Sequence, residues 1–192
     1  TFASGLRAFM RQDPDIIMVG EIRDTETAEI AIRASLTGHL VLSTLHANTA
    51  VGAISRLLDM DVESFLITSS VLGVISQRLT RKICEHCKVS YEADIGEKKA
   101  LGIDVNESVT IYRGKGCERC NNTGYKGRLG IFEMLEITPE IKELIDSSAN
   151  QREILKMARK QGMVSLKEDI VKKVLNGKTT VEEMIRIILM TD

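Results

Sequence analysis

Residues 15–24 read Asp-Ile-Ile-Met-Val-Gly-Glu-Ile-Arg-Asp, an apolar run that ends in charged side chains. The four apolar residues, 16–19, predict a strand that is buried on both faces of a sheet. Glu21 then follows at the carboxyl end of that strand. A carboxylate in this place suits a nucleotide site, where it holds the water shell of Mg²⁺ or polarises an attacking water. Because many strands end in a glutamate without such a role, the neighbouring strand has to support this interpretation.

The next apolar stretch covers residues 37–48 and reads Thr-Gly-His-Leu-Val-Leu-Ser-Thr-Leu-His-Ala-Asn. It predicts a second buried strand over residues 39–46. Between the two strands, residues 25–36 predict a helix that stops at Gly38. Strand, helix and strand in this order predict an α/β fold with a parallel sheet.

The two strands are expected to end at the same edge of the sheet, since parallel strands point the same way. His46 follows the second strand and should therefore lie near Glu21. His39 stands at the other, entry end of the same strand. It is either a nucleotide-binding residue or an ordinary residue of the loop between helix and strand, and the sequence leaves both open.

Two strands are too few for a stable sheet, and the chain begins with Thr1 instead of Met. We therefore expect it to be part of a longer protein. Further helices are predicted over residues 5–12, 49–60 and 62–78. The last of these contains an uncharged run, residues 64–77, whose 14 residues are too few to span a bilayer and indicate a buried helix.

All four cysteines occur in two Cys-x-x-Cys pairs, Cys84 with Cys87 and Cys117 with Cys120, separated by 29 residues. Two such knuckles can bring four thiolates to one tetrahedral zinc ion. Four thiolates leave no open coordination position, so this zinc would be structural and not catalytic. Redox-active or simply reduced thiols are the competing interpretations. His86 could replace one ligand, but a solvated residue between two ligands is the simpler expectation.

The chain is expected to have three parts. Residues 1–80 carry the two strands and their helices, and residues 81–130 form a small zinc-binding subdomain rich in glycine and polar residues. Residues 131–192 form a helical subdomain.

Helix start signals are frequent in that last part. They are Thr138-Pro139, Asn150, Ser165-x-x-Glu168 and Thr180-x-x-Glu183, and the last two have the form of capping boxes. The final helix carries an apolar stripe at positions 181, 184, 185, 188 and 189. Core packing is the preferred explanation for this stripe, and a partner surface is the alternative.

Several function classes are excluded or weakened by composition. The net charge of −1, the 4% of aromatic residues and the absence of Trp speak against direct nucleic-acid binding. The sequence predicts no transmembrane segment. Gly177-Lys178-Thr179 looks like the end of a phosphate-binding loop, but Lys172 stands where that loop needs a glycine. Gly177 is better explained as the terminator of the preceding helix.

Five segments together resemble the secretion ATPases of type II secretion and type IV pilus assembly. Residues 11–24 resemble the Walker B element of that family, and residues 37–48 its His box. Residues 77–84 resemble the opening of its tetracysteine metal subdomain. Its C-terminal segments are matched by residues 127–133 and 177–186. The resemblance covers essentially the whole chain.

This resemblance implies the C-terminal part of a RecA-like ATPase that uses Mg-ATP and works as a homo-hexamer. It implies a cytoplasmic location at the inner membrane, with a membrane platform protein and cytoplasmic assembly components as partners. Glu21 would be the catalytic glutamate, approaching Mg-ATP through water, and His46 would sense the terminal phosphate or couple subunits. Arg23 and His39 are weaker candidates for contact with the nucleotide, and Arg23 with Asp24 is expected to shape the turn.

The phosphate loop of that family would precede Thr1, so we expect the chain alone to be inactive. Retraction motors of the superfamily generally lack the tetracysteine segment, which favours assembly or secretion here. The residues do not separate type II secretion from pilus assembly or DNA-uptake pseudopili. A zinc-stabilised protein-interaction module without catalytic activity is the alternative function.

Overall fold

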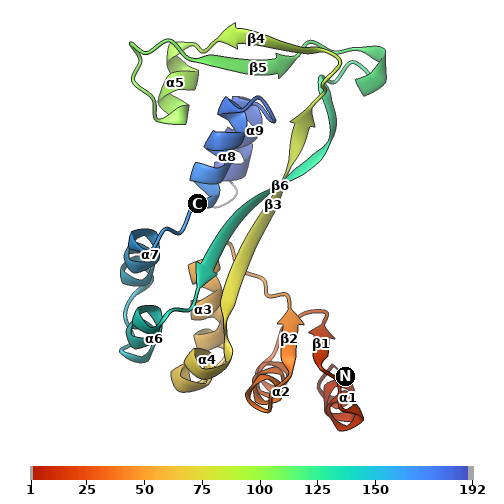
Figure 1. The fold of residues 1–192 in the computed structure, drawn as a ribbon, viewed down its shortest axis with the longest axis vertical. Coiled ribbons are helices and arrows are strands. Elements are labelled where there is room, and N and C mark those ends of the chain that lie inside the picture. Colours follow the sequence, from red (N-terminus) through yellow and green to blue (C-terminus); the bar gives the residue numbers. More distant parts are fainter. Residues whose placement is uncertain (1, 190–192) are drawn as a thin grey trace. The chain divides into compact units, whose positions relative to one another are not determined.

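The computed structural model describes residues 2–189, which form two compact units (Figure 1). Unit 1 takes the residues up to Ile75 together with Met134–Met163, and unit 2 takes Ser76–Glu133 and the residues from Val164 onward. Each unit is therefore built from two separate segments of the chain. The predicted helical part, residues 131–192, is divided between the units, and the three-part functional division stays a prediction.

Unit 1 begins with the α/β arrangement that the sequence predicts. Its elements are α1 (Phe2–Phe9), the 3₁₀ turn η1 (Met10–Gln12), β1 (Ile16–Val19), α2 (Thr25–Leu36) and β2 (Leu40–Ser43). The strands β1 and β2 pair in parallel over their whole length. Asp24 begins α2 by accepting a hydrogen bond from the backbone N–H of Thr27 at 2.8 Å, which satisfies a helix donor that has no partner within the helix.

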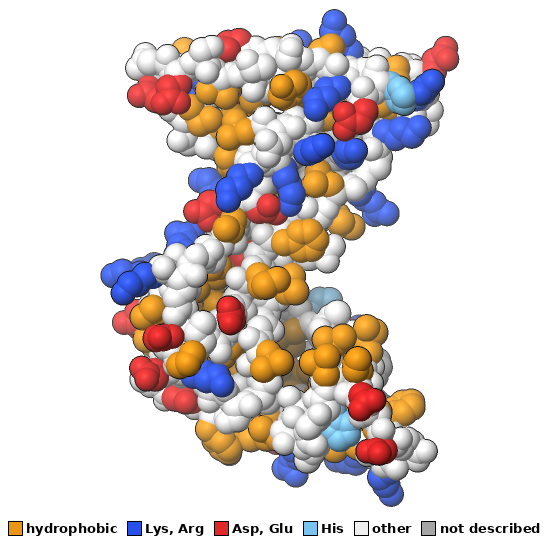
Figure 2. All heavy atoms as spheres, in the orientation of Figure 1, with side chains coloured by type: hydrophobic (Ala, Val, Ile, Leu, Met, Phe, Trp, Pro, Cys, Tyr) orange, Lys and Arg blue, Asp and Glu red, His pale blue; other side chains and the backbone are white. Residues whose placement is uncertain are grey.

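The predicted burial of these strands on both faces is wrong. Ile17 and Val19 pack against α1 and α2, but Met18 on the opposite face is 78% exposed. Leu40 and Leu42 of β2 are also exposed, and orange side chains lie uncovered over this part of unit 1 in Figure 2. The physical reason is that α1 and α2 both cover the same face of the sheet, and no element of unit 1 within residues 2–189 covers the opposite face.

The predicted helix over residues 62–78 is wrong in its second half. The helix α4 (Ser64–Ser70) ends before Val71, whose backbone is extended, and β3 (Gly73–Ile83) follows. The partner of β3 is β6 (Tyr125–Glu136), about 50 positions further along the chain. Because this distant strand supplies the backbone hydrogen bonds, an uncharged run that could have continued as a helix becomes a strand.

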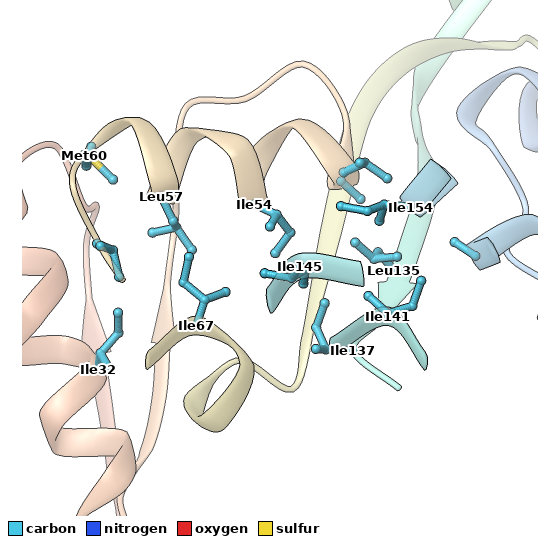
Figure 3. Packing of buried hydrophobic residues seen from close by; sticks show 14 of the residues in the cluster. Ile32, Ile54, Leu57, Met60, Ile67, Leu135, Ile137, Ile141, Ile145 and Ile154 are labelled. Atoms are coloured by element: carbon cyan, nitrogen blue, oxygen red, sulfur yellow. The ribbon is translucent and has the colours of Figure 1, made fainter. Parts of the chain in front are cut away.

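The core of unit 1 joins the two segments of that unit. It is formed by α3 (Ala50–Asp59) and α4 from the first segment, and by α6 (Pro139–Asp146) and α7 (Gln151–Lys160) from the second. Figure 3 shows Ile54 and Ile67 of the first segment lying among Leu135, Ile141 and Ile145 of the second. All five side chains are fully buried, so unit 1 depends on contacts between residues far apart in sequence.

Unit 2 contains the cysteines and the last two helices. Its elements beyond β3 and β6 are β4 (Lys88–Glu92), α5 (Ile95–Leu101), β5 (Thr110–Gly114), the 3₁₀ turn η2 (Glu118–Cys120), α8 (Leu166–Leu175) and α9 (Val181–Leu189). The strands β4 and β5 are antiparallel. The core lies between β5, β6, α8 and α9 and includes Ile111, Ile131, Ile170 and Met184.

The apolar stripe predicted on α9 is only partly a core face. Val181 and Met184 are buried, whereas Ile185 and Leu189 are exposed. The buried face instead includes Ile187 and the carboxylate of Glu183. Among residues 2–189, no helix combines the length and the apolar character that crossing a bilayer requires.

Three of the four helix start signals act as predicted. Thr138 caps α6, and Asn150–Glu153 and Ser165–Glu168 form reciprocal capping boxes at α7 and α8. The fourth signal is different. The backbone N–H of Glu183 does bond the hydroxyl of Thr180 at 3.3 Å, but the carboxylate of Glu183 turns away from the cap.

That carboxylate is fully buried and accepts six hydrogen bonds in unit 2. Three come from Arg81, two from Arg186 and one from the hydroxyl of Thr80, and each carboxylate oxygen receives three. Desolvation alone would raise the pKa of Glu183, but the donors from Arg186 and Arg81 outweigh it and lower the pKa from 4.5 to about 2. Glu183 thus joins α9 to β3.

Candidate functional site

Two hydrogen bonds join the carboxyl ends of β1 and β2 at one edge of the sheet. The hydroxyl of Thr44 donates to the carbonyl of Gly20 at 2.7 Å, and the N–H of Ile22 donates to the carbonyl of Thr44 at 2.9 Å. The loop that carries Glu21 is therefore held on both sides. The tie through Thr44 was not predicted, although a hydroxyl directly after an apolar strand was a usable signal.

Glu21 has two basic neighbours at this edge. Its Oε2 lies 2.5 Å from Nε of Arg23 and 3.4 Å from Nε2 of His46. The expected proximity of His46 and Glu21 is therefore present. The hydrogen bond from Arg23 is the main cause that lowers the pKa of Glu21, against a smaller opposing effect of burial. The carboxylate is ionised at neutral pH and can accept a proton from a water molecule.

His39 is not brought to this edge, because it precedes β2 while Glu21 follows β1. Its Nδ1 lies 2.9 Å from the carbonyl oxygen of Ala34 and 3.2 Å from the hydroxyl of Thr37, both at the end of α2. These contacts favour the alternative in which His39 closes the turn between helix and strand. Contact of His39 with a nucleotide stays a prediction.

The four cysteine sulfurs form a single cluster, with all Sγ atoms within 4.8 Å of one another. Cys84 and Cys117 are 3.9 Å apart, Cys87 and Cys120 are 3.8 Å apart, and Cys117 and Cys120 are 3.7 Å apart. None of them is in a disulfide. Four sulfurs placed tetrahedrally at about 2.3 Å from zinc would be about 3.8 Å apart, so these spacings fit a zinc ion.

Two glycines on either side of the second knuckle lie in close backbone contact. A Cβ atom on Gly114 would lie 2.1 Å from the carbonyl oxygen of Gly124, so no other residue fits at Gly114 without a shift of the backbone. That same carbonyl accepts the N–H of Cys84 at 2.9 Å. This bond joins the backbone of the first knuckle to the segment that follows the second.

The surroundings of the sulfurs act differently on the individual thiols. Burial raises the pKa of Cys87 to about 12, which is unfavourable for a thiolate without a cation. At Cys120, burial is outweighed by the N–H groups of Cys117 and Gly124, and the pKa falls to about 6. Lys and Arg side chains gather around this part of unit 2 in Figure 2.

His86 lies outside the sulfur cluster. Its ring nitrogens are 2.7 Å and 3.0 Å from Nη1 of Arg119. Among the described residues, the only group of His, Cys, Asp and Glu side chains able to hold a metal is the four cysteines. The expectation of a solvated residue between two ligands therefore agrees with the structure.

Comparison with known proteins identifies the relatives of this chain. The model of the family "Type II/IV secretion system protein" matches residues 1–186. Type II secretion system protein E of Pseudomonas aeruginosa is 53% identical over 187 residues, which cover 97% of this chain and 37% of that protein. The type IV pilus assembly ATPase PilB of Thermus thermophilus is 53% identical, with 96% of this chain and 21% of that protein covered.

A solved structure supports the same relationship. The pilus retraction motor PilT with bound ADP superposes with a TM-score of 0.66 and 27% identity, over 97% of this chain and 43% of that chain. The chain thus spans well under half the length of these relatives. From the match of the family model and the identity of these relatives, we conclude that the chain belongs to the type II/IV secretion system protein family.

Proposed function

We propose that this chain is the C-terminal part of a RecA-like ATPase that powers pilus or pseudopilus assembly and protein secretion. The observation that carries the proposal is the placement of Glu21 between His46 and Arg23, where two parallel strands end. The names of the relatives, a type II secretion protein and a pilus assembly ATPase, support the same activity. As the resemblance implies, the parent would be a homo-hexamer at the cytoplasmic face of the inner membrane, acting with a platform protein.

In this proposal each residue at the strand edge has a distinct task. Glu21 accepts a proton from the water that attacks the terminal phosphate, and it approaches the metal only through water. Bound Mg²⁺ would neutralise phosphate charge at this edge. His46, close to Glu21 and largely exposed, is placed to reach the terminal phosphate or a neighbouring subunit. The chain alone, without a phosphate-binding loop in its sequence, is proposed to be inactive.

The test is Glu21→Gln in the full-length parent. The variant should lose ATP hydrolysis but keep ATP binding, because the amide cannot take up the proton yet has the same shape. Glu29→Gln is the matched control, since Glu29 lies on α2 and forms a long ion pair with Arg33, at 3.8 Å. If Glu21→Gln hydrolyses ATP at the wild-type rate, the chain is better described as a protein-interaction module.

We also propose that the four cysteines bind one structural zinc ion. The sulfur spacings support this, and a closed set of four thiolates would leave the metal without a catalytic position. Elemental analysis of the purified chain should give one zinc per chain. A chelated, metal-free chain that melts at an unchanged temperature would rule out the structural role.

A further inference from the structure

The carboxylate of Glu21 is engaged by a cation of its own loop. Arg23 and His46 both approach the same oxygen, Oε2, and Arg23 is nearer by almost an ångström. Arginine is also charged at any physiological pH. In this arrangement the arginine is therefore the dominant partner of Glu21.

This contact opposes the chemistry proposed for Glu21. A carboxylate that accepts a hydrogen bond from a guanidinium group is a weaker base, and its lowered pKa agrees with this. The oxygen is also occupied, so a water molecule must compete with Arg23 for it. The arrangement suits a state in which hydrolysis is held back.

Release of Glu21 requires movement of the Arg23 side chain alone, because the backbone on both sides of Arg23 is held by hydrogen bonds. The backbone before Arg23 is fixed by the bonds of Gly20 and Ile22 to Thr44, and the backbone after it by the cap of Asp24 on α2. The side chain of Arg23 is itself 68% exposed, and no other ion pair of Arg23 is found within residues 2–189. Exposed ion pairs are weak, so the phosphates of a nucleotide can draw this guanidinium away.

We propose that Arg23 restrains Glu21 as a proton acceptor, and that hydrolysis requires this guanidinium to leave Oε2 after a nucleoside triphosphate has occupied the strand edge. Arg23 is then a positioning residue that acts through Glu21. This inference rests on the proposed function, because it regulates the same carboxylate. It differs from a simple role in the turn, which Asp24 already supplies by capping α2.

The experiment measures single-turnover ATP hydrolysis in the full-length parent. Arg23→Gln should raise the rate about twofold to fivefold, the factor by which a weak exposed ion pair can hold a group back. The dissociation constant of ATP should rise by less than about fivefold, because only one exposed contact between a guanidinium and a phosphate is lost. Arg23→Lys keeps the charge and should restore most of the restraint. Arg33→Gln, which removes an exposed arginine on α2, is the control and should leave the rate unaltered.

Two further outcomes separate this inference from the proposed function. The double variant Glu21→Gln with Arg23→Gln should be as inactive as Glu21→Gln alone, because the gain acts through the carboxylate. A rate for Arg23→Gln that is unchanged or lower, or ATP binding weakened more than about fivefold, overturns the restraint while an inactive Glu21→Gln still supports the ATPase. An active Glu21→Gln overturns both.

Discussion

Replacing Glu183 by Gln should destabilise unit 2 by about 3 kcal/mol. The carboxylate is fully buried, and the fall of its pKa from 4.5 to about 2 corresponds to about 3 kcal/mol of favourable interaction with its donors. The geometry agrees with this magnitude. Gln has one acceptor oxygen, so in either orientation it keeps three of the six donors and turns its own amide donors toward the other three. Arg81 and Arg186 are partly exposed and can regain water, which limits the loss.

The assay uses the tyrosines of the chain. All three, Tyr91, Tyr112 and Tyr125, lie in unit 2, and the chain has no Trp. Urea unfolding followed by tyrosine fluorescence therefore reports on unit 2. Glu182→Gln is the matched control, because Glu182 is next in sequence and 76% exposed, and it should change stability by less than about 1 kcal/mol. If Glu183→Gln unfolds at the same urea concentration as Glu182→Gln, the reasoning is refuted.

Three further predictions use the same chain. The stability difference between wild type and Glu183→Gln should be fully present above about pH 4.5 and should vanish as the pH falls toward about 2. The reason is that a carboxyl group whose pKa is lowered in the folded state contributes stability only while it is ionised. Urea titrations at a series of pH values measure this difference. Cys117→Ser should lose stoichiometric zinc in elemental analysis and unfold at lower urea concentration, since three ligands hold zinc less tightly than four; retained zinc with unchanged unfolding would contradict this. Gly114→Ala should destabilise unit 2 by more than about 2 kcal/mol, because its Cβ meets the backbone of Gly124 at 2.1 Å. Gly127→Ala is the comparison and should lose about 1 kcal/mol, because the space there is open and only a φ of +82° is unfavourable. Equal losses of stability in urea unfolding would remove the steric explanation.

Local patterns in the sequence were sufficient for much of the strand edge and the cysteine cluster. The helix over residues 25–36 was predicted with the bounds that the structure has, and the parallel order of the strands correctly placed His46 beside Glu21. The doubled Cys-x-x-Cys spacing likewise predicted four converging sulfurs. In each case the deciding residues are close in sequence, or their proximity follows from the shared direction of two neighbouring strands.

Features that depend on distant residues were missed. Residues 73–78 carry only a weak strand signal, Gly73 followed by the β-branched Val74 and Ile75, and pairing with the distant β6 makes them a strand. Thr180-x-x-Glu183 has the pattern of a capping box, yet Glu183 binds Arg81, which lies 102 positions earlier. The local motif could not predict this, because the fold brings the guanidinium groups of Arg81 and Arg186 to the carboxylate of Glu183.

The division of each unit into two segments has a consequence for synthesis. During translation, the residues up to Ile75 emerge first, but α3 and α4 lack their packing partners until the chain has been extended through α7. Unit 2 waits in turn for α8 and α9, which are synthesised after α7. Neither unit can finish folding before the chain has been extended past α7, so a product interrupted earlier exposes apolar helices and becomes a target for chaperones and proteases.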